Sequence, residues 1–173
     1  MALTLKALGL SQGQRVLEIG TGSGYAAALL SLIAEEVYTV ERIEALANVA
    51  RAQLVRLGFH NVHVLHGDGT LGWSEYAPYD AIAVAAGVPE IPQSLREQLA
   101  LGGRLAIPLG PAEAQVLTRV TRESESSYRE ERITDVCFVP LIGAQGWSES
   151  ARWSEGPPGP ATPTRGPSAC ANP

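Results

Sequence analysis

Short apolar runs alternate with amphipathic stretches along most of the chain. Five apolar, β-rich runs bounded by turn residues predict strands at 15–19, 37–40, 61–65, 80–86 and 104–108. Apolar residues at helical spacing predict helices at 25–34, 43–57 and 92–99, and an earlier helix that covers residues 3–10. Strands that alternate with helices predict an α/β fold, with a mostly parallel, twisted sheet and helices on both faces.

The pattern changes after the fifth predicted strand. Residues 116–121 and 133–140 alternate between apolar and polar side chains, around the polar stretch 122–131. They predict an antiparallel strand pair added to the edge of the sheet. Residues 1–147 therefore form one predicted domain, while 148–173 are rich in Pro, Gly, Ser and Thr and predict a disordered tail.

Composition narrows the class of protein. The formal net charge of -5 argues against nucleic-acid binding, and no apolar run is long enough to cross a membrane. Cys137 and Cys170 form no disulfide framework, which favours a cytoplasmic protein, with a secreted protein carrying one disulfide as the alternative. His60, His63 and His66 recur every third residue, but positions on a strand alternate between faces, so no metal site is predicted.

A glycine-rich turn follows the first predicted strand, in the run from Val16 to Gly24 (VLEIGTGSG). Gly20 and Gly22 let the backbone pass close to a ligand. Their Gly-x-Gly-x-Gly spacing differs from the dinucleotide fingerprint, which leaves two residues before its third glycine. Glu18 precedes the turn, where its charge would repel a pyrophosphate and favour a cationic amino acid or sulfonium. The alternative role for Glu18 is a carboxylate that only caps the turn.

Two further acidic residues follow the next two predicted strands. Glu41 comes about twenty residues after Gly20, a position from which a carboxylate accepts hydrogen bonds from both ribose hydroxyls. Asp68, in the run His66-Gly-Asp-Gly69, could accept the amino group of an adenine, with Gly69 leaving room for the ring. Because ligands bind at the carboxyl ends of parallel strands, the three turns together predict a nucleoside site.

The order and spacing of several runs resemble protein-L-isoaspartate O-methyltransferases from about Leu3 to Trp147. The runs that carry the resemblance are VLEIGTGSGY, VYTVERI, HGDGTLGW, YDAIAVAAGVPEIP, LALGGRLAIPLG and FVPLIGAQGW. The resemblance implies a Rossmann-like methyltransferase fold that uses S-adenosyl-L-methionine (SAM). By the same resemblance, the SAM contacts fall on Gly20, Thr21, Glu41, Arg42, Asp68 and Gly69. It also implies the substrate, which is the free α-carboxylate of isoaspartyl residues in damaged proteins and peptides, and hence a role in protein repair.

One part of the family pattern has no counterpart in these 173 residues. The family carries a Gly-Gln-Thr-Ile-Ser-like segment before this region, and Met1 falls inside the helix that follows it. The resemblance therefore implies an N-terminally truncated form, for which we expect weak methylation of isoaspartyl peptides or none.

Few side chains capable of proton transfer occur in the predicted site, and no catalytic residue is predicted. A carboxylate nucleophile, with an ordinary pKa of about 4, is already ionised at neutral pH and needs no general base. Three alternatives stay open at this point: a SAM-binding module without turnover, a methyltransferase for a small molecule, and a nicotinamide dehydrogenase that the glycine spacing disfavours.

Overall fold

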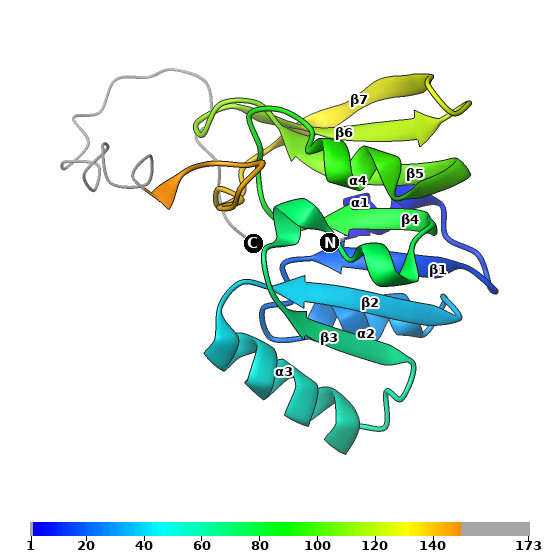
Figure 1. Ribbon diagram of the computed structural model, residues 1–173, viewed down its shortest axis with the longest axis vertical. Helices are drawn as coiled ribbons and strands as arrows, with labels where there is room; N and C mark the ends of the chain where they lie inside the picture. Colours follow the sequence, from blue (N-terminus) through cyan, green and yellow to red (C-terminus); the bar gives the residue numbers. More distant parts are fainter. Residues whose placement is uncertain (1, 150–173) are drawn as a thin grey trace.

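The computed structural model describes residues 2–149, and the elements follow the predicted alternation of strands and helices (Figure 1). The helices are α1 (Ala2–Leu8), α2 (Tyr25–Ser31), α3 (Glu44–Arg56) and α4 (Gln93–Glu97), with the 3₁₀ turns η1 (Gly69–Leu71) and η2 (Ser74–Tyr76). The strands are β1 (Arg15–Ile19), β2 (Glu36–Glu41), β3 (Val62–His66), β4 (Tyr79–Val84), β5 (Leu99–Leu109), β6 (Gln115–Arg122) and β7 (Tyr128–Val136).

Within the described residues the strands form one seven-stranded sheet in the order β3-β2-β1-β4-β5-β6-β7. The pairs among β3, β2, β1, β4 and β5 are parallel, and β6 and β7 are antiparallel. The strand order runs outward from β1 in one direction (β1, β2, β3) and from β4 in the other (β4, β5). The boundary between β1 and β4 is therefore the topological switch point, where open α/β sheets bind ligands. The predicted α/β fold with an antiparallel C-terminal pair is confirmed.

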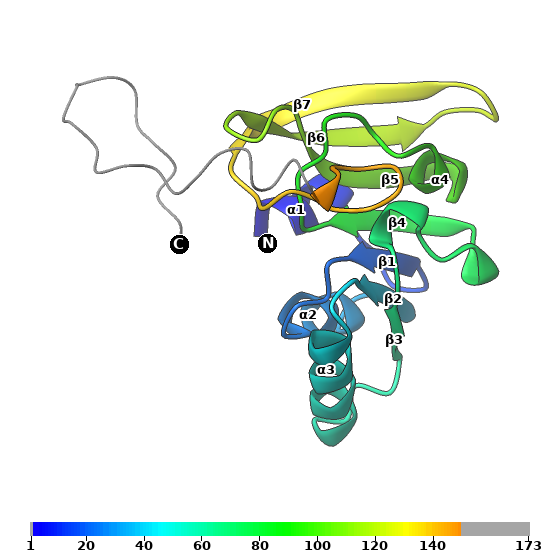
Figure 2. The same ribbon diagram turned by 60° about the vertical axis from the view of Figure 1, so that its left-hand side comes forward.

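Elements cover both faces of the sheet (Figure 2). On one face, buried side chains of α1, α2 and α3 pack on β1, β2 and β4, for example Leu8, Leu30 and Leu54 against Val16 and Val37. The other face is covered by α4 and by the short turns η1 and η2. Leu95 of α4, Tyr76 of η2 and the neighbouring Trp73 pack there on the buried side chains of the strands. The central parallel strands β1, β2 and β4 are therefore buried on both sides, which is why they are mostly apolar in sequence, whereas the edge strand β3 is only partly buried.

Several boundaries differ from the sequence prediction, among them the start of β5 at Leu99 rather than at 104, and two of the differences have identifiable reasons. Helix α2 ends at Ser31 rather than near residue 34, because the Asn61 side-chain amide donates to the carbonyls of Ser31 and Ala34 at its C-terminal end. Strand β7 begins at Tyr128, inside the polar stretch that the pattern assigned to the turn. Because β7 lies at the edge of the sheet, its charged side chains can reach water, and such charges also protect an edge from unwanted pairing.

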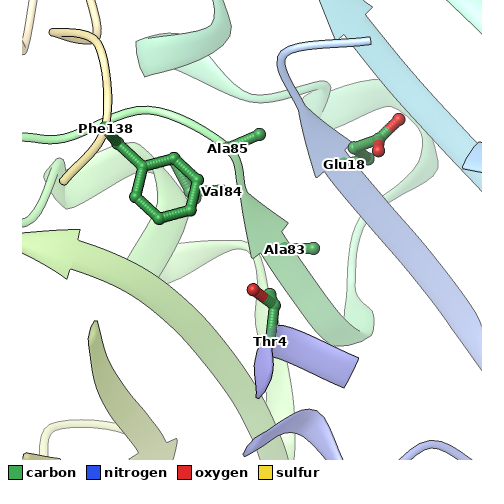
Figure 3. A pocket seen from close by; sticks show the side chains of 6 residues that line it. All are labelled: Thr4, Glu18, Ala83, Val84, Ala85 and Phe138. Atoms are coloured by element: carbon green, nitrogen blue, oxygen red, sulfur yellow. The ribbon is translucent and has the colours of Figure 1, made fainter. Parts of the chain in front are cut away.

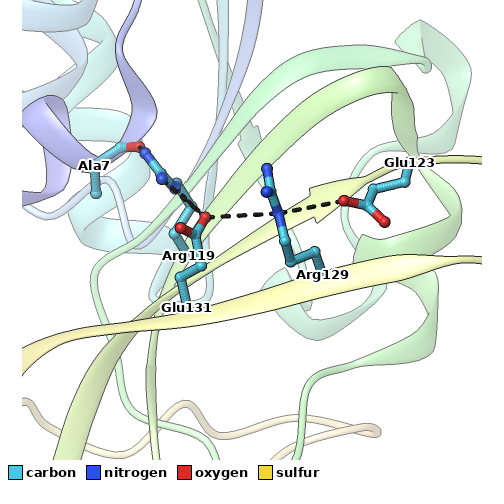
Figure 4. Close-up of polar contacts among 5 residues, drawn as sticks. All are labelled: Ala7, Arg119, Glu123, Arg129 and Glu131. Atoms are coloured by element: carbon cyan, nitrogen blue, oxygen red, sulfur yellow. Dashed lines mark hydrogen bonds and ion pairs between the residues drawn. The ribbon is translucent and has the colours of Figure 1, made fainter.

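Ion pairs connect β6 and β7 on the surface of the antiparallel pair, and a hydrogen bond extends from them to α1 (Figure 4). The Arg119 guanidinium donates to Glu131 at 2.8 Å and 3.0 Å, and to the carbonyl of Ala7 near the end of α1 at 3.4 Å. Arg129 continues the row to Glu123 at 3.3 Å. The hydrogen bonds from Arg119 hold the pKa of the Glu131 carboxyl below its ordinary value. These contacts fix α1 against the strand pair, and α1 contributes one wall of the site described next.

Part of the predicted tail lies outside the described residues. Ser148 and Glu149 are described, and 150–173, which include Trp153 and Cys170, are not. Within residues 2–149 we find no helix that combines the length and the apolar character needed to span a membrane.

Candidate functional site

The glycine-rich turn connects the end of β1 to α2 and has three glycines with positive φ, the last of which, Gly24, is the N-cap of α2. Gly20 has a φ of 95° and Gly22 a φ of 53°, in the left-handed region that side chains disfavour. A Cβ on Gly20 would also lie 3.4 Å from the Ala85 Cβ, just beyond β4. The turn therefore lies close to the switch point between β1 and β4, as the sequence predicted.

Glu41 holds this turn in place. One carboxylate oxygen accepts the backbone N–H of Gly22 at 2.9 Å, and the other accepts the N–H of Ile43 at 2.9 Å. The side chain is 7% exposed. Each oxygen keeps a free lone pair, so the carboxylate is already oriented to accept two further hydrogen bonds. The second role, in bracing the glycine turn, was not predicted.

Glu18 is buried between β1 and α1 and has one oxygen with a partner and one without. The hydroxyl of Thr39 donates to Oε2 at 2.6 Å, and Oε1 has no hydrogen-bond partner in residues 2–149. Burial, the dominant cause, raises the pKa of Glu18 to about 8, the Thr39 hydrogen bond lowers it, and the neighbouring charge of Glu41 raises it slightly. An unpaired buried carboxylate oxygen is costly to maintain, and it would be satisfied by a cationic donor.

Thr39 was not predicted as a site residue. It lies on β2, and its hydroxyl connects Glu18 of β1 to Thr21 of the glycine-rich turn. Its hydroxyl lies 2.6 Å from that of Thr21, and since Thr39 uses its proton on Glu18, Thr21 donates to Thr39. Both threonines are buried. A polar residue inside the otherwise apolar run Val37–Val40 was the available signal.

A small cavity of about 10 Å³ lies beside Glu18 (Figure 3). The side chains around it come from α1, β1, the end of β4 and the segment after β7, and they are Thr4, Glu18, Ala83, Val84, Ala85 and Phe138. A volume of this size suits one water molecule or one ammonium group. Thr4 and Phe138 were not predicted as site residues, because nothing in their local sequence indicates that they meet at Glu18.

Asp68 lies at the end of β3 and has several partners within the protein. Its Oδ1 accepts the N–H and the hydroxyl of Thr70, at 2.8 Å and 2.7 Å, and so caps η1. Its Oδ2 accepts the N–H of Ala144 at 2.7 Å. Asp68 therefore ties the loop 141–147 to the carboxyl end of β3, and one lone pair of Oδ2 stays available for a ligand.

Gly69 is required by packing inside the protein. A Cβ on Gly69 would collide with the side chain of Ile19, which is 1% exposed at the end of β1. This contact with the core is a second reason for glycine at this position, beside the predicted space for an adenine ring.

This contact gives a prediction for stability. We expect Gly69→Ala to lower the free energy of unfolding by about 1–3 kcal/mol, because Ile19 is buried and has no room to move away. Gly67→Ala is the matched control in the same turn, since a Cβ there would meet ordinary contacts of 3.7 Å with Leu65. Thermal unfolding of both variants checks the prediction, and equal melting temperatures would contradict it.

The remaining predicted contact, Arg42, points toward Glu149, with 2.8 Å between the guanidinium and the carboxylate. The histidines do not converge: His63 lies 2.7 Å from the Glu36 carboxylate, and His66 lies 3.2 Å from the carbonyl of Arg42. Over residues 2–149, no three His, Cys, Asp or Glu side chains are grouped in a way that could hold a metal ion. The predicted site residues therefore fall into two neighbouring groups. Around the turn after β1 lie Glu18, Gly20, Thr21, Gly22 and Glu41, and at the end of β3 lie Asp68 and Gly69.

A larger hollow, of about 430 Å³, lies between α2 and α3 and is distinct from these groups. Its lining is mostly apolar and includes Tyr25, Leu32, Leu57 and Phe59. Since charged side chains are absent from that lining, the hollow does not offer the carboxylates expected for a sulfonium or a ribose.

Comparison with known proteins places this geometry in a family. The profile of the family described as protein-L-isoaspartate(D-aspartate) O-methyltransferase matches residues 1–146. Protein-L-isoaspartate O-methyltransferase 1 of Geotalea uraniireducens is 58% identical over 148 residues, which are 85% of this chain and 68% of the relative. The chain spans about two thirds of the length of the curated relatives it matches.

Solved structures agree with the sequence relatives. One protein-L-isoaspartate O-methyltransferase aligns with a TM-score of 0.78 at 33% identity, covering 84% of this chain and 47% of its own. A second, from Plasmodium falciparum and solved in complex with S-adenosyl-L-homocysteine, aligns with a TM-score of 0.71 at 30% identity, covering 82% of this chain and 72% of its own. The chain belongs to the protein-L-isoaspartate(D-aspartate) O-methyltransferase family.

Proposed function

We propose that the protein is a SAM-dependent carboxyl O-methyltransferase that acts on isoaspartyl residues in proteins and peptides. The observation that carries the proposal is the pair of carboxylates on adjacent parallel strands: Glu41, oriented by two backbone N–H groups, and Glu18, buried with one free oxygen. Family membership supports the reaction, and the relative solved with S-adenosyl-L-homocysteine supports the cofactor.

The residues at the strand ends fit the parts of SAM. Glu41 offers two lone pairs to the ribose hydroxyls, and Asp68 offers one to the adenine amino group, on the next strand. Glu18 offers its free oxygen to the ammonium group at the amino-acid end, from a cavity of matching size. Gly20 and Gly22 keep the backbone between these groups free of side chains.

When bound, SAM would supply an electrophilic methyl carbon on a positively charged sulfur; an already ionised carboxylate oxygen would bond to that carbon as the carbon–sulfur bond breaks and S-adenosyl-L-homocysteine leaves. The protein therefore has to position groups rather than transfer protons. Holding two reactants in line can supply roughly 7–11 kcal/mol of the barrier, so a site without a catalytic acid or base suffices. Glu41 also places negative charge near the sulfonium, and Glu18, whose pKa of about 8 keeps it protonated at neutral pH in the ligand-free protein, adds to that charge once it ionises on binding the ammonium group. A cytoplasmic location belongs to this proposal, since two cysteines without framework spacing suit a reducing compartment.

The test is transfer of a labelled methyl group from SAM to an isoaspartyl peptide, with the normal aspartyl peptide as control. We expect the 173-residue chain to act slowly, and the same chain extended by a Gly-Gln-Thr-Ile-Ser-containing segment to act faster, on the isoaspartyl peptide only. The Glu41→Ala variant of the extended form serves as the inactive control. Equal labelling of both peptides would favour a small-molecule methyltransferase, and cofactor binding without any labelling would favour a binding module.

A further inference from the structure

Gln115, the first residue of β6, is a buried polar side chain with no role in the site described so far. It is 2% exposed. Its amide makes hydrogen bonds with both backbone groups of Phe138. The N–H of Phe138 donates to Oε1 at 2.9 Å, and Nε2 donates to the carbonyl of Phe138 at 3.0 Å. The side chain thus makes the pair of hydrogen bonds that a neighbouring strand would make.

Gly87, just after β4, makes room for this amide. A Cβ on Gly87 would lie 2.5 Å from the amide carbon of Gln115, so any side chain there would displace it. The backbone of Gly87 pairs with the same segment, since its N–H donates to Val139 and its carbonyl accepts from Leu141, each at 2.8 Å. The segment after β7 is therefore held at the end of β4 by Gln115 and Gly87 together.

The ring of Phe138 is the part of this segment that reaches the site. It lines the 10 Å³ cavity beside Glu18, next to Val84 and Ala85 (Figure 3). Thr4 of α1 lines the same cavity. The ring and Thr4 thus border the space around a carboxylate whose Oε1 has no partner in residues 2–149.

We propose that Gln115 is a positioning residue: its amide holds the backbone of Phe138 so that the ring closes the cavity around the free oxygen of Glu18. This inference rests on the proposed function for its consequence, because the cavity is where the ammonium group of SAM would bind. Gln115 itself touches neither Glu18 nor the cavity, and acts through Phe138.

The physical effect of the ring is to exclude water. A closed, water-poor cavity strengthens the attraction between a carboxylate and a cation. An open cavity lets water satisfy Glu18 and weakens that attraction. Glu41 is the charged group with a resolved effect on Glu18, Thr39 is hydrogen-bonded to it, and Thr4 lines the same cavity. Phe138 carries the largest apolar side chain of that lining, so its removal is the change that should most alter the solvation of Glu18.

The test compares three variants of the 173-residue chain. Gln115→Met keeps the volume and removes both hydrogen bonds to Phe138, together with the 3.3 Å bond from Nε2 to the carbonyl of Ala112. Phe138→Ala removes the ring. Thr118→Val is the matched control, because Thr118 is buried on the same strand and donates to Val116 within β6, away from Phe138. The first readout is the Glu18 pKa of the ligand-free protein, from a carbon-13 NMR titration in which the Glu18→Gln variant assigns the signal. The second readout is the affinity for S-adenosyl-L-homocysteine, from calorimetry well below each melting temperature.

We expect Gln115→Met and Phe138→Ala to lower the Glu18 pKa toward its ordinary value and to weaken binding by about tenfold. The double variant should add little to either single one, and Thr118→Val should change the melting temperature alone. An unchanged Glu18 pKa in Gln115→Met would overturn the proposal and leave Gln115 a purely structural residue. If the wild-type chain binds no S-adenosyl-L-homocysteine, the proposed function fails, and the NMR titration still decides the role of Gln115.

Discussion

Replacing Glu41 by alanine is expected to weaken binding of S-adenosyl-L-homocysteine roughly 10- to 150-fold, which corresponds to a loss of about 1.5–3 kcal/mol. The side chain is held by the N–H groups of Gly22 and Ile43 before any ligand arrives. Its oxygens therefore do not lose conformational freedom when they accept the ribose hydroxyls, and the hydrogen bonds formed are charge-assisted.

The control for this prediction is Glu44→Ala. Glu44 is exposed in the first turn of α3, so its removal changes the net charge by the same amount a short distance from the site. Calorimetric titration of both variants should show a large loss for Glu41→Ala and almost none for Glu44→Ala. Glu41→Ala also loses the two hydrogen bonds that hold the glycine-rich turn. Circular dichroism should therefore show that the variant is folded before its affinity is compared. Equal losses in the two variants would remove Glu41 from the ribose site.

Replacing Glu18 by glutamine is expected to change how stability depends on pH. The folded-state pKa of Glu18, about 8, lies above the ordinary value of 4.5. The folded protein therefore binds the proton more tightly than the unfolded chain. The resulting stability is present in full below pH 4.5 and is lost as the pH rises through 8.

Relative to Glu18→Gln, the ligand-free wild-type protein should lose roughly 3–5 kcal/mol of stability between pH 5 and pH 9. Urea unfolding of both proteins across this range measures the difference, in which the other titrating groups cancel. Parallel pH profiles for the two proteins would show that Glu18 ionises in the folded protein as easily as in water.

The same carboxyl group should couple cofactor binding to pH. An ammonium group at the free oxygen favours ionised Glu18, so binding at pH 7 should release about one proton from the wild-type protein and none from Glu18→Gln. Calorimetry in two buffers with different heats of ionisation counts the protons. Affinity in the wild-type protein should rise from pH 6 to pH 8.

The fold and the strand-end positions of the site were predictable because their signals are local. Alternating apolar runs located the parallel strands, and Glu18, Gly20, Gly22 and Glu41 each carried a signal from spacing relative to the end of a strand. The same local view failed at β7, where an edge strand tolerates charges that resemble a loop.

The supporting contacts could not be predicted, because each joins residues that only the folded sheet brings together. Thr39 meets Glu18 across neighbouring strands, and Gln115 meets Phe138 across a hairpin and a loop. The packing role of Gly69 was missed for a related reason: the position of Ile19, which fills the space beside it, follows from the pairing of β1 with its neighbours. A glycine in the sequence indicates that a side chain would not fit, but it does not identify the group that occupies the space.

The most direct measurement is a crystal structure of the protein with S-adenosyl-L-homocysteine. We expect the ribose hydroxyls within hydrogen-bond distance of the Glu41 carboxylate, the adenine amino group beside Asp68, and the ammonium group directed at the free oxygen of Glu18. A ligand bound between α2 and α3, or bound with its ribose away from Glu41, would contradict the site proposed at the ends of β1, β2 and β3.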